Sequence, residues 1–287
     1  MVKLNDNEIT TREVLDWRGM HLLHWHTSSC SQKTRIVLAL KNVSWTGRLV
    51  NLSTGQQTEP WFMGVNPRGL VPVLVVNGEV HVESNDIFQL IETLFPAPAL
   101  IPPGQAERVL HELAFEDDLH LDLRTLSFRF VFGRTGPNKS PEQLEAYRTL
   151  GAKTVGGAPD TPKEKEIAYY ERLAAEGITD EACRASFQRF REAFDRLDRD
   201  LAVSPFILGE ELSILDVAWY VYAFRLTLGG FPLERLHPNV ARWFASLDAR
   251  PEFAAEVALP EAMAARQKEV RAEQIATGTT MAEVVGL

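Results

Sequence analysis

The pattern of apolar and polar positions divides the chain into a mixed first part and a helical second part. In the first part, short runs of bulky residues alternate with segments whose apolar residues recur every three or four positions. Such runs predict strands, and such recurrence predicts helices. After residue 104 only the helical pattern is found. The runs that predict strands are residues 21–25, 45–52, 71–76 and 79–83.

Residues 20–41 combine a strand, a polar turn and a helix. The turn carries the thiol of Cys30 and four hydroxyls that can cap a helix, at Thr27, Ser28, Ser29 and Ser31. Three basic residues lie off the apolar face of the predicted helix: Lys33, Arg35 and Lys41. Because the first turn of a helix attracts negative charge, we expect an anion here, either a carboxylate or a thiolate.

Two further signals fix the order of the later strands. Asn77-Gly78 predicts a tight hairpin, so the strands on either side of it are expected to be antiparallel. Pro72 lies near the start of the first of these strands and cannot donate a ladder hydrogen bond, which is compatible with a cis Val71–Pro72 bond. Ser84 can cap the next helix. The predicted order is β-α-β-α-β-β-α, a small α/β domain.

Composition gives the expected domain boundaries. The polar N-terminal segment is expected to be a flexible extension or a short surface helix. A segment rich in proline and glycine predicts a linker between the two domains. The expected parts are residues 1–19 (N-terminal extension), 20–96 (α/β domain), 97–104 (linker), 105–260 (all-helical domain, irregular or inserted at about 133–182) and 261–287 (C-terminal tail).

Charge and cysteine content exclude several classes of function. The net charge of −9 argues against nucleic acid as the main partner. Two cysteines exclude a disulfide framework, and His24 and His26 lack further ligands at metal spacing, so no metal site is expected. The sequence contains no uninterrupted apolar run of about 18 residues, so no membrane span is expected. The N-terminus is too polar for a secretory signal, so a cytoplasmic location is expected.

Four motifs, in this order, resemble those of the cytosolic glutathione S-transferases. SSCSQKTRI at residues 28–36 resembles the active-site turn of the serine-type classes, the zeta class in particular, and NPRGLVPVL at residues 66–74 resembles the cis-proline segment. Glu83-Ser84 resembles the pair that holds the γ-glutamyl end of glutathione, and residues 213–216 resemble the capping box of the helical domain.

This resemblance spans about residues 20–260 and implies a fold. The fold is an α/β thioredoxin-like N-terminal domain followed by an all-α C-terminal domain. The long region at about residues 133–182 also resembles the ganglioside-induced differentiation-associated protein branch of the superfamily. The membrane-anchoring tail of that branch is not found in this sequence.

The resemblance also implies how glutathione would be activated. A free thiol titrates near 8.5, so only a few per cent of it is thiolate at pH 7. A hydroxyl donor at a helix N-terminus favours the thiolate, and lowering the pKa by about two units is worth roughly 2.7 kcal/mol. Ser28 is the expected donor, and Ser29 could share this role. Cys30 is expected to pack at the helix start, with redox reactivity as the competing hypothesis.

The expected glutathione-binding residues follow from the same motifs. Val71, which precedes Pro72, would offer its backbone N–H and C=O to the cysteinyl part of glutathione. Glu83 and Ser84 would bind the γ-glutamyl ammonium and carboxylate.

The glycyl end is where this sequence departs from related classes. Those classes hold the glycyl carboxylate with a His or Lys near the position of Gln57, whereas this chain has Gln57 and Thr58 there. Gln57 or Lys41 could serve instead.

The implied activity is a glutathione transferase or lyase with a role in detoxification. The thiolate would attack an aromatic, halogenated or ether substrate, by conjugation or by β-etherase-like cleavage, in a homodimer. The alternatives are a zeta-like cis–trans isomerase, a non-catalytic binding or regulatory protein with this fold, and a cysteine-type reductase that works through Cys30.

Overall fold

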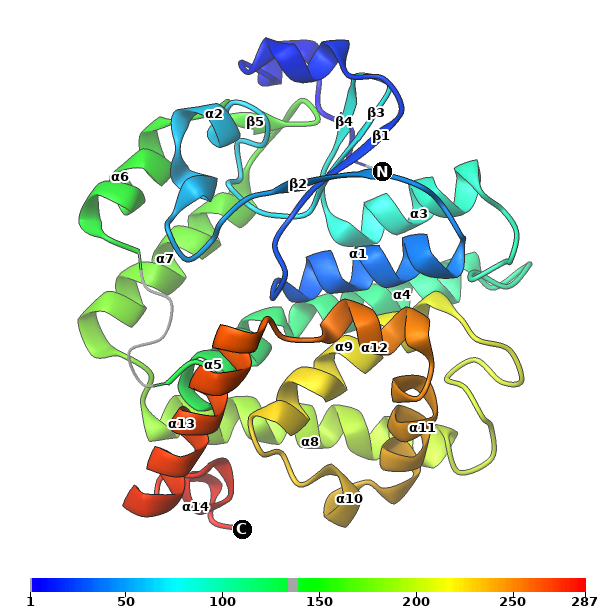
Figure 1. Cartoon of the computed structure of the whole chain (residues 1–287), viewed down its shortest axis with the longest axis vertical. Coiled ribbons are helices and arrows are strands. Elements are labelled where there is room, and N and C mark those ends of the chain that lie inside the picture. The colour runs from blue at the N-terminus through cyan, green and yellow to red at the C-terminus, as the bar shows by residue number, and fades with distance from the viewer. Residues whose placement is uncertain (1, 134–138) are drawn as a thin grey trace. The chain divides into compact units, whose positions relative to one another are not determined.

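The computed structural model describes residues 2–133 and 139–287, which form two compact units. Unit 1 contains Met1–Pro96 and Asn138–Glu176, and unit 2 contains Ala97–Pro137 and Gly177–Leu287 (Figure 1). This division differs from the one expected from the sequence, because residues 138–176 join the N-terminal unit and not the helical one.

A mixed four-stranded sheet of order β2-β1-β3-β4 forms the centre of unit 1. β1 is parallel to β2 and antiparallel to β3, which is antiparallel to β4. The predicted thioredoxin-like arrangement of strands and helices is thereby confirmed. The elements are β1 (Met20–His24), α1 (Ser29–Leu40), β2 (Thr46–Leu49), η3 (Gln56–Thr58), α2 (Pro60–Met63), β3 (Val73–Val76), β4 (Glu79–His81) and α3 (Ser84–Leu94).

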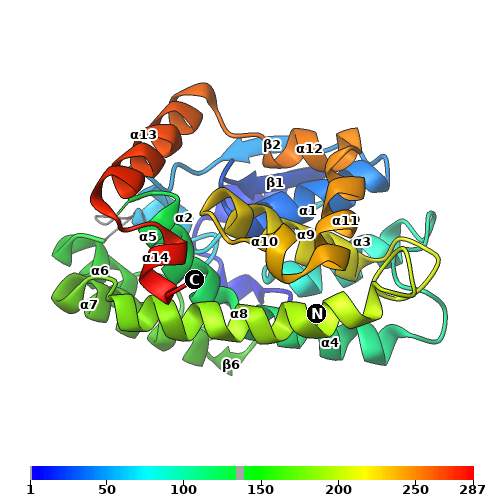
Figure 2. The ribbon, with the colours of Figure 1, turned by 90° about the horizontal axis from the view of Figure 1, so that it is seen from below.

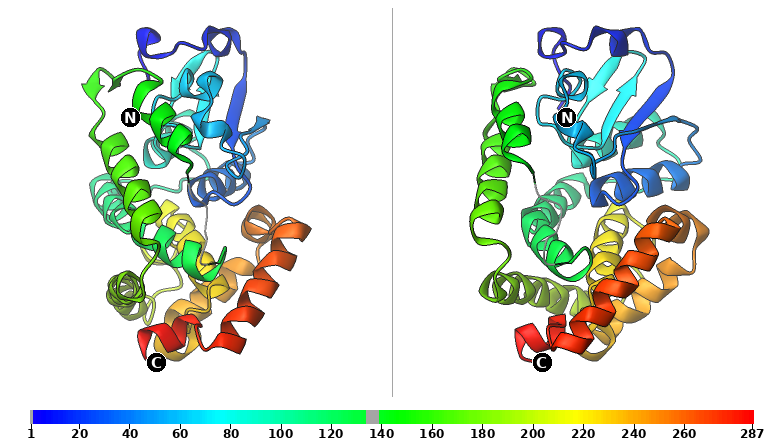
Figure 3. Two further views of the ribbon diagram at one scale, coloured as in Figure 1. Left: turned by 90° about the vertical axis from the view of Figure 1, so that its left-hand side faces the viewer. Right: turned by 60° about the vertical axis from the view of Figure 1, so that its left-hand side comes forward.

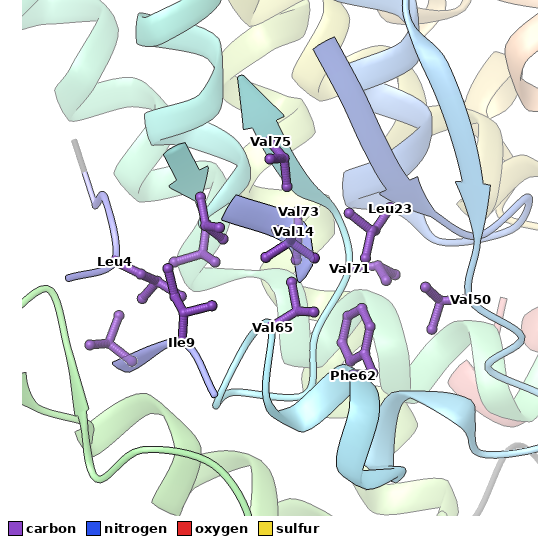
Figure 4. Close-up of a cluster of buried hydrophobic side chains, with 13 residues drawn as sticks. Leu4, Ile9, Val14, Leu23, Val50, Phe62, Val65, Val71, Val73 and Val75 are labelled. Carbon is purple, nitrogen blue, oxygen red and sulfur yellow. The ribbon is translucent and has the colours of Figure 1, made fainter. Parts of the chain in front are cut away.

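Side chains from the two faces of the sheet enter separate layers, because neighbouring strand residues point in opposite directions. Helices α1 and α3 pack against each other along one face (Figure 1). On the other face, Leu23 of β1 joins Val73 and Val75 of β3 in a buried apolar cluster that includes Phe62 of α2 (Figure 4).

The N-terminal segment is part of this unit's core. Leu4 donates its N–H to the carbonyl oxygen of Val80 at 2.9 Å, so the chain runs along β4. The side chains of Leu4, Ile9 and Val14 are buried in the apolar cluster (Figure 4). Two 3-10 helices, η1 (Asp6–Glu8) and η2 (Arg12–Asp16), connect these anchors. The expected flexible extension or surface helix is not what forms, because isolated apolar residues gave no recognisable period.

The inserted segment, residues 138–176, packs on unit 1 through polar contacts as well as apolar ones. The Glu8 carboxylate accepts the backbone N–H groups of Gly156 and Gly157 at 2.9 Å each, and these bonds hold the turn of a small hairpin. Figure 3 shows the two helices of the segment standing beside the strands of unit 1. The elements are α6 (Pro141–Thr149), β5 (Thr154–Val155), β6 (Ala158–Pro159) and α7 (Thr161–Glu176).

Unit 2 is built from helices, as the sequence predicts for the second domain. Helix α9 is buried almost completely, and α8 runs alongside α5 (Figure 2). Among the residues that the structure describes, no helix is long and apolar enough to cross a membrane. The elements are α4 (Ala106–Asp118), α5 (His120–Phe130), α8 (Asp180–Asp200), α9 (Ile214–Leu228), α10 (Leu233–Leu236), α11 (Pro238–Asp248), α12 (Pro251–Val257), α13 (Glu261–Thr277) and α14 (Met281–Val285).

The predicted capping box at the start of α9 is present and has a wider role. The Asp216 carboxylate accepts the N–H and the hydroxyl of Ser213 at 2.8 and 2.7 Å. It also accepts the N–H of Ile207 at 3.0 Å and the indole N–H of Trp243 at 2.9 Å. Burial raises the pKa of Asp216, while these four hydrogen bonds favour its charged form. One side chain therefore joins the preceding loop, α9 and α11.

We expect Asp216→Ala to destabilise the protein by about 3 kcal/mol, because it leaves several buried hydrogen-bond donors without an acceptor. The midpoint of urea denaturation, followed by tryptophan fluorescence, measures this loss. Glu211→Ala removes an exposed carboxylate from the same loop and should leave the midpoint unchanged. Equal midpoints for Asp216→Ala and the wild type would show that the capping box does not stabilise this unit.

Candidate functional site

Ser28 is the N-cap of α1, one of the four hydroxyl residues that the sequence offered for this role. Its Oγ accepts the backbone N–H of Ser31 at 3.3 Å, and its side chain is half-buried. Among the described residues, none accepts a hydrogen bond from the Ser28 hydroxyl. The O–H is therefore available as a donor at the positive end of a helix.

The other small residues of this turn differ from Ser28 in exposure. Ser29 is buried in the first turn of α1, and Ser31 is fully buried, with its Oγ 3.4 Å from the N–H of Trp25. Cys30 is half-buried. Ser31 thus stabilises the turn from inside, while Ser28 and Cys30 are the more accessible of the polar side chains.

Arg35 holds this turn from within the protein. Its guanidinium donates to the carbonyl oxygens of Trp25 and His26, both at 3.2 Å, and lies 3.4 Å from Nδ1 of His24. Burial, followed by the Arg35 charge, lowers the pKa of His24 to about 4, so the ring is neutral near pH 7 and Nδ1 can accept from Arg35. The sequence placed Arg35 off the apolar face of the helix, but the structure buries it.

His24 and His26 do not form part of a recognisable metal site. Their rings meet edge-on with centroids 6.1 Å apart. Within residues 2–133 and 139–287, no three side chains of His, Cys, Asp or Glu come together as metal ligands would.

Val71 lies beside the same turn. The Val71–Pro72 bond is cis, and β3 begins at Val73. Because Leu23 of β1 pairs with Val73, Val71 falls opposite the start of the turn that follows β1. Its side chain is anchored in the apolar cluster, and its N–H and C=O form no hydrogen bond with any described residue (Figure 4). Both backbone groups are thus available to an extended ligand.

Glu83 and Ser84 lie at the start of α3. Glu83 is the N-cap with φ +69° and ψ 117°, a backbone conformation that is rare outside glycine and costs about 1–3 kcal/mol. Ser84 is the first residue of the helix and is buried. The arrangement places a carboxylate, a hydroxyl and the N–H groups of a helix start within one short segment.

Arg68 connects this segment to the inserted one. Its Nη1 donates to Oε1 of Glu83, and its Nε donates to Oδ1 of Asp160 at 2.8 Å. Burial opposes the charge of Arg68, but the two carboxylates outweigh it and raise the pKa of Arg68. Sequence reasoning missed both residues. Arg68 lies inside the recognised Asn-Pro-Arg-Gly turn, but nothing near it in the sequence points to a partner 92 residues away.

Gln57 and Lys41, the two residues considered for binding the glycyl carboxylate, differ in their position in the structure. Gln57 is buried in η3, and its Oε1 has no hydrogen-bond partner among the described residues. Lys41 is the C-cap of α1, at the end opposite Ser28, where its Nζ lies 2.8 Å from the carbonyl oxygen of Phe95 and 2.5 Å from a Glu92 carboxylate oxygen. The hypothesis that Lys41 binds the glycyl carboxylate is therefore wrong, and Gln57 stays a candidate.

Two models of one protein family match this chain. The family model "Glutathione S-transferase, N-terminal domain" matches residues 27–94, and "Glutathione S-transferase, C-terminal domain" matches residues 168–246. Together they cover just over half of the chain. Residues 95–167, which include α6, β5 and β6, lie outside both matches.

Individual relatives are distant. The chain is 25% identical over 247 residues to the tetrachloro-p-hydroquinone reductive dehalogenase of Sphingobium chlorophenolicum, covering 83% of this chain and 96% of that protein. It is 36% identical over 92 residues to a maleylacetoacetate isomerase of Pseudomonas aeruginosa, covering 31% and 43%. The solved structure of the β-etherase LigF from Sphingobium sp. strain SYK-6 has a TM-score of 0.65 at 20% identity, covering 83% of this chain and 98% of that one.

The likeness to the β-etherase shows the fold alone, whereas the two family models cover the segments in which the four sequence motifs lie. With a thioredoxin-like unit that presents Ser28, Val71 and Glu83, and a helical unit that begins after it, the chain belongs to the glutathione S-transferase superfamily.

Proposed function

We propose that this protein is a glutathione transferase in which Ser28 stabilises the thiolate of bound glutathione. The observation that carries the proposal is the Ser28 hydroxyl, which caps α1 and has no acceptor among the described residues. Val71 would bind the cysteinyl backbone through its N–H and C=O, which holds the sulfur near that hydroxyl. Gln57 would contribute to the glycyl end, and Glu83 and Ser84 to the γ-glutamyl end.

The second substrate is proposed to be an electrophile that carries a leaving group. The thiolate attacks carbon, the carbon–sulfur bond forms, and a halide or phenolate departs with the electron pair of the broken bond. Support comes from a relative whose name specifies reductive dehalogenation of a chlorinated hydroquinone. The runner-up is isomerisation of a maleyl compound, since a maleylacetoacetate isomerase matches 92 residues at 36% identity.

Replacement of Ser28 by Ala should raise the pKa of enzyme-bound glutathione by a unit or more, because the hydroxyl donor to the thiolate is lost. At pH 7 the conjugation rate should fall by about tenfold with little change in glutathione affinity. The ultraviolet absorbance of the thiolate, titrated against pH with glutathione bound, gives the pKa directly.

Two variants control for the structural role of Ser28 as a helix cap. Ser28→Gly lacks the hydroxyl but caps a helix nearly as well as Ser, so it should repeat the pKa change with little loss of stability. Ser29→Ala should leave the pKa in place. A pKa unchanged by both Ser28 substitutions would assign thiolate stabilisation to Ser29 or to the helix N-terminus.

A reductive reaction is the second candidate, favoured by the position of Cys30. This thiol is half-buried in the first turn of α1, whereas Cys183 is buried in α8 and its pKa is raised to about 12. In such a reaction the Cys30 sulfur attacks the sulfur of an aryl–glutathione adduct. The aryl carbon leaves with the electron pair and takes a proton, and a second glutathione resolves the mixed disulfide. One aryl halide and two glutathione molecules then give the arene, glutathione disulfide and hydrogen halide.

We expect Cys30→Ser to abolish glutathione disulfide formation from a chlorinated hydroquinone, while conjugation to a simple aryl halide persists within about twofold. Chromatographic measurement of glutathione disulfide and of released chloride separates the two reactions. Cys183→Ala serves as the control for loss of a thiol elsewhere in the chain. Undiminished disulfide formation by Cys30→Ser would remove the reductive candidate.

A further inference from the structure

The inserted segment contacts the turn at residues 66–69, which comes shortly before Val71 in the chain. The Tyr147 hydroxyl of α6 donates to the carbonyl oxygen of Gly69 at 2.7 Å. Gly69 has φ +60°, and a Cβ atom there would lie 2.8 Å from Cε2 of Tyr147. The turn and α6 are therefore packed too closely for any side chain at Gly69. Neither family model covers this part of α6.

From the same segment, Asp160 reaches the neighbouring Arg68. Asp160, Arg68 and Glu83 are linked in this order by hydrogen bonds, and their side chains become more exposed to solvent from Asp160 to Glu83. The side chain of Asp160 is 3% exposed, that of Arg68 11% and that of Glu83 37%. Arg68 lies in the middle and donates to both carboxylates through different nitrogens.

Asp160 is held in this position by the fold of the hairpin before it. It directly follows β6, and Glu8 binds the hairpin turn through the N–H groups of Gly156 and Gly157. The charge of Lys163 also attracts the Asp160 carboxylate, but the Lys163 Nζ donates its hydrogen bond to the carbonyl oxygen of Leu150 at 3.0 Å. The Oδ2 atom of Asp160 has no hydrogen-bond partner among the residues described.

This sharing of Arg68 has an electrostatic consequence at Glu83. A guanidinium bound to a single carboxylate can donate two parallel hydrogen bonds and neutralise it. Here the guanidinium is shared between two carboxylates, with Nη1 directed at Glu83 and Nε at Asp160. The side chains of Asp160, Arg68 and Glu83 together carry a net charge of −1, and Glu83 is the most exposed of the three.

We propose that Asp160 is a positioning residue that keeps Glu83 negative towards an incoming α-ammonium group, so that the inserted segment completes the site for the γ-glutamyl end of glutathione. This inference rests on the proposed function. Asp160 does not touch the ligand. It binds Arg68 through Nε, and its charge offsets that of Arg68. The ligand class is an α-amino acid end, whose carboxylate would meet Ser84 and the N-terminus of α3.

The test compares glutathione with its deaminated analogue, glutaryl-cysteinyl-glycine, which lacks only the α-ammonium group. Asp160→Asn retains an oxygen that can accept from Nε of Arg68 but removes the charge. We expect the dissociation constant of glutathione to rise about tenfold in this variant and that of the analogue to stay within about twofold. With saturating glutathione the turnover number should be unchanged. Isothermal titration calorimetry and steady-state kinetics measure these quantities.

The ratio of the two dissociation constants within one protein cancels a general loss of folded enzyme. Glu171→Gln is the matched control, since it removes another carboxylate of the inserted segment, one that pairs with Arg148 on the surface. Arg68→Lys is a second variant, because one ammonium cannot reproduce the fork, and it should also lose the preference for glutathione. Equal weakening of both ligands, or of neither, by Asp160→Asn overturns the inference. Failure of the wild type to bind glutathione overturns the proposed function instead.

Discussion

The site of unit 1 depends on two buried guanidinium groups, those of Arg35 and Arg68. They stabilise loops that lie outside the hydrogen-bonded strands of the sheet. Arg35 binds the carbonyl oxygens of the turn after β1, and Arg68 binds a carboxylate at the start of α3. A buried charge is costly unless it is paired or hydrogen-bonded, so each guanidinium fixes the groups that surround it. Arg35 thereby fixes backbone oxygens, whereas Arg68 fixes side chains from two distant segments.

The two arginines support the binding of oppositely charged groups of one substrate, the thiolate and the ammonium group of glutathione. A thiolate is favoured by the N–H groups at the start of α1 and by the Ser28 hydroxyl, and Arg35 supports that turn without entering it. An ammonium group is favoured by Glu83, whose charge would be cancelled if Arg68 belonged to it alone. The proposed role of Asp160 follows from this second need, since it divides the guanidinium between two carboxylates.

The inserted segment is integrated into unit 1 at several independent points. Glu8 binds its hairpin, Tyr147 packs against Gly69, and Asp160 pairs with Arg68. Burial opposes the charge of Glu8, but hydrogen bonds from the Thr154 side chain and from the backbone N–H groups of Asn5, Gly157 and Gly156 outweigh it and lower the pKa of Glu8, so this carboxylate is charged at neutral pH. Because each contact buries a polar group in a defined geometry, the segment has one way to dock. A surface loop added only for length would not need such contacts.

The sequence by itself determined the features whose signal lies within a few residues. The Asn77-Gly78 hairpin and the capping box at Ser213 each follow from local backbone chemistry. The same chemistry placed a helix start among the hydroxyls of residues 27–31 and was compatible with the cis Val71–Pro72 bond. The α/β order of the first part and the helical second part follow from apolar periodicity. These predictions succeeded because neighbouring residues alone decide turns, caps and the period of an element.

Only the tertiary structure decided which distant polar groups meet. It buried Arg35, paired Lys41 with Glu92, moved residues 138–176 into unit 1 and joined Arg68 to Asp160. Such pairs leave no periodic trace, because a charged residue has the same local preferences whether its partner is water or a buried carboxylate. Their positions depend on which surfaces pack together, and that is settled by the whole chain.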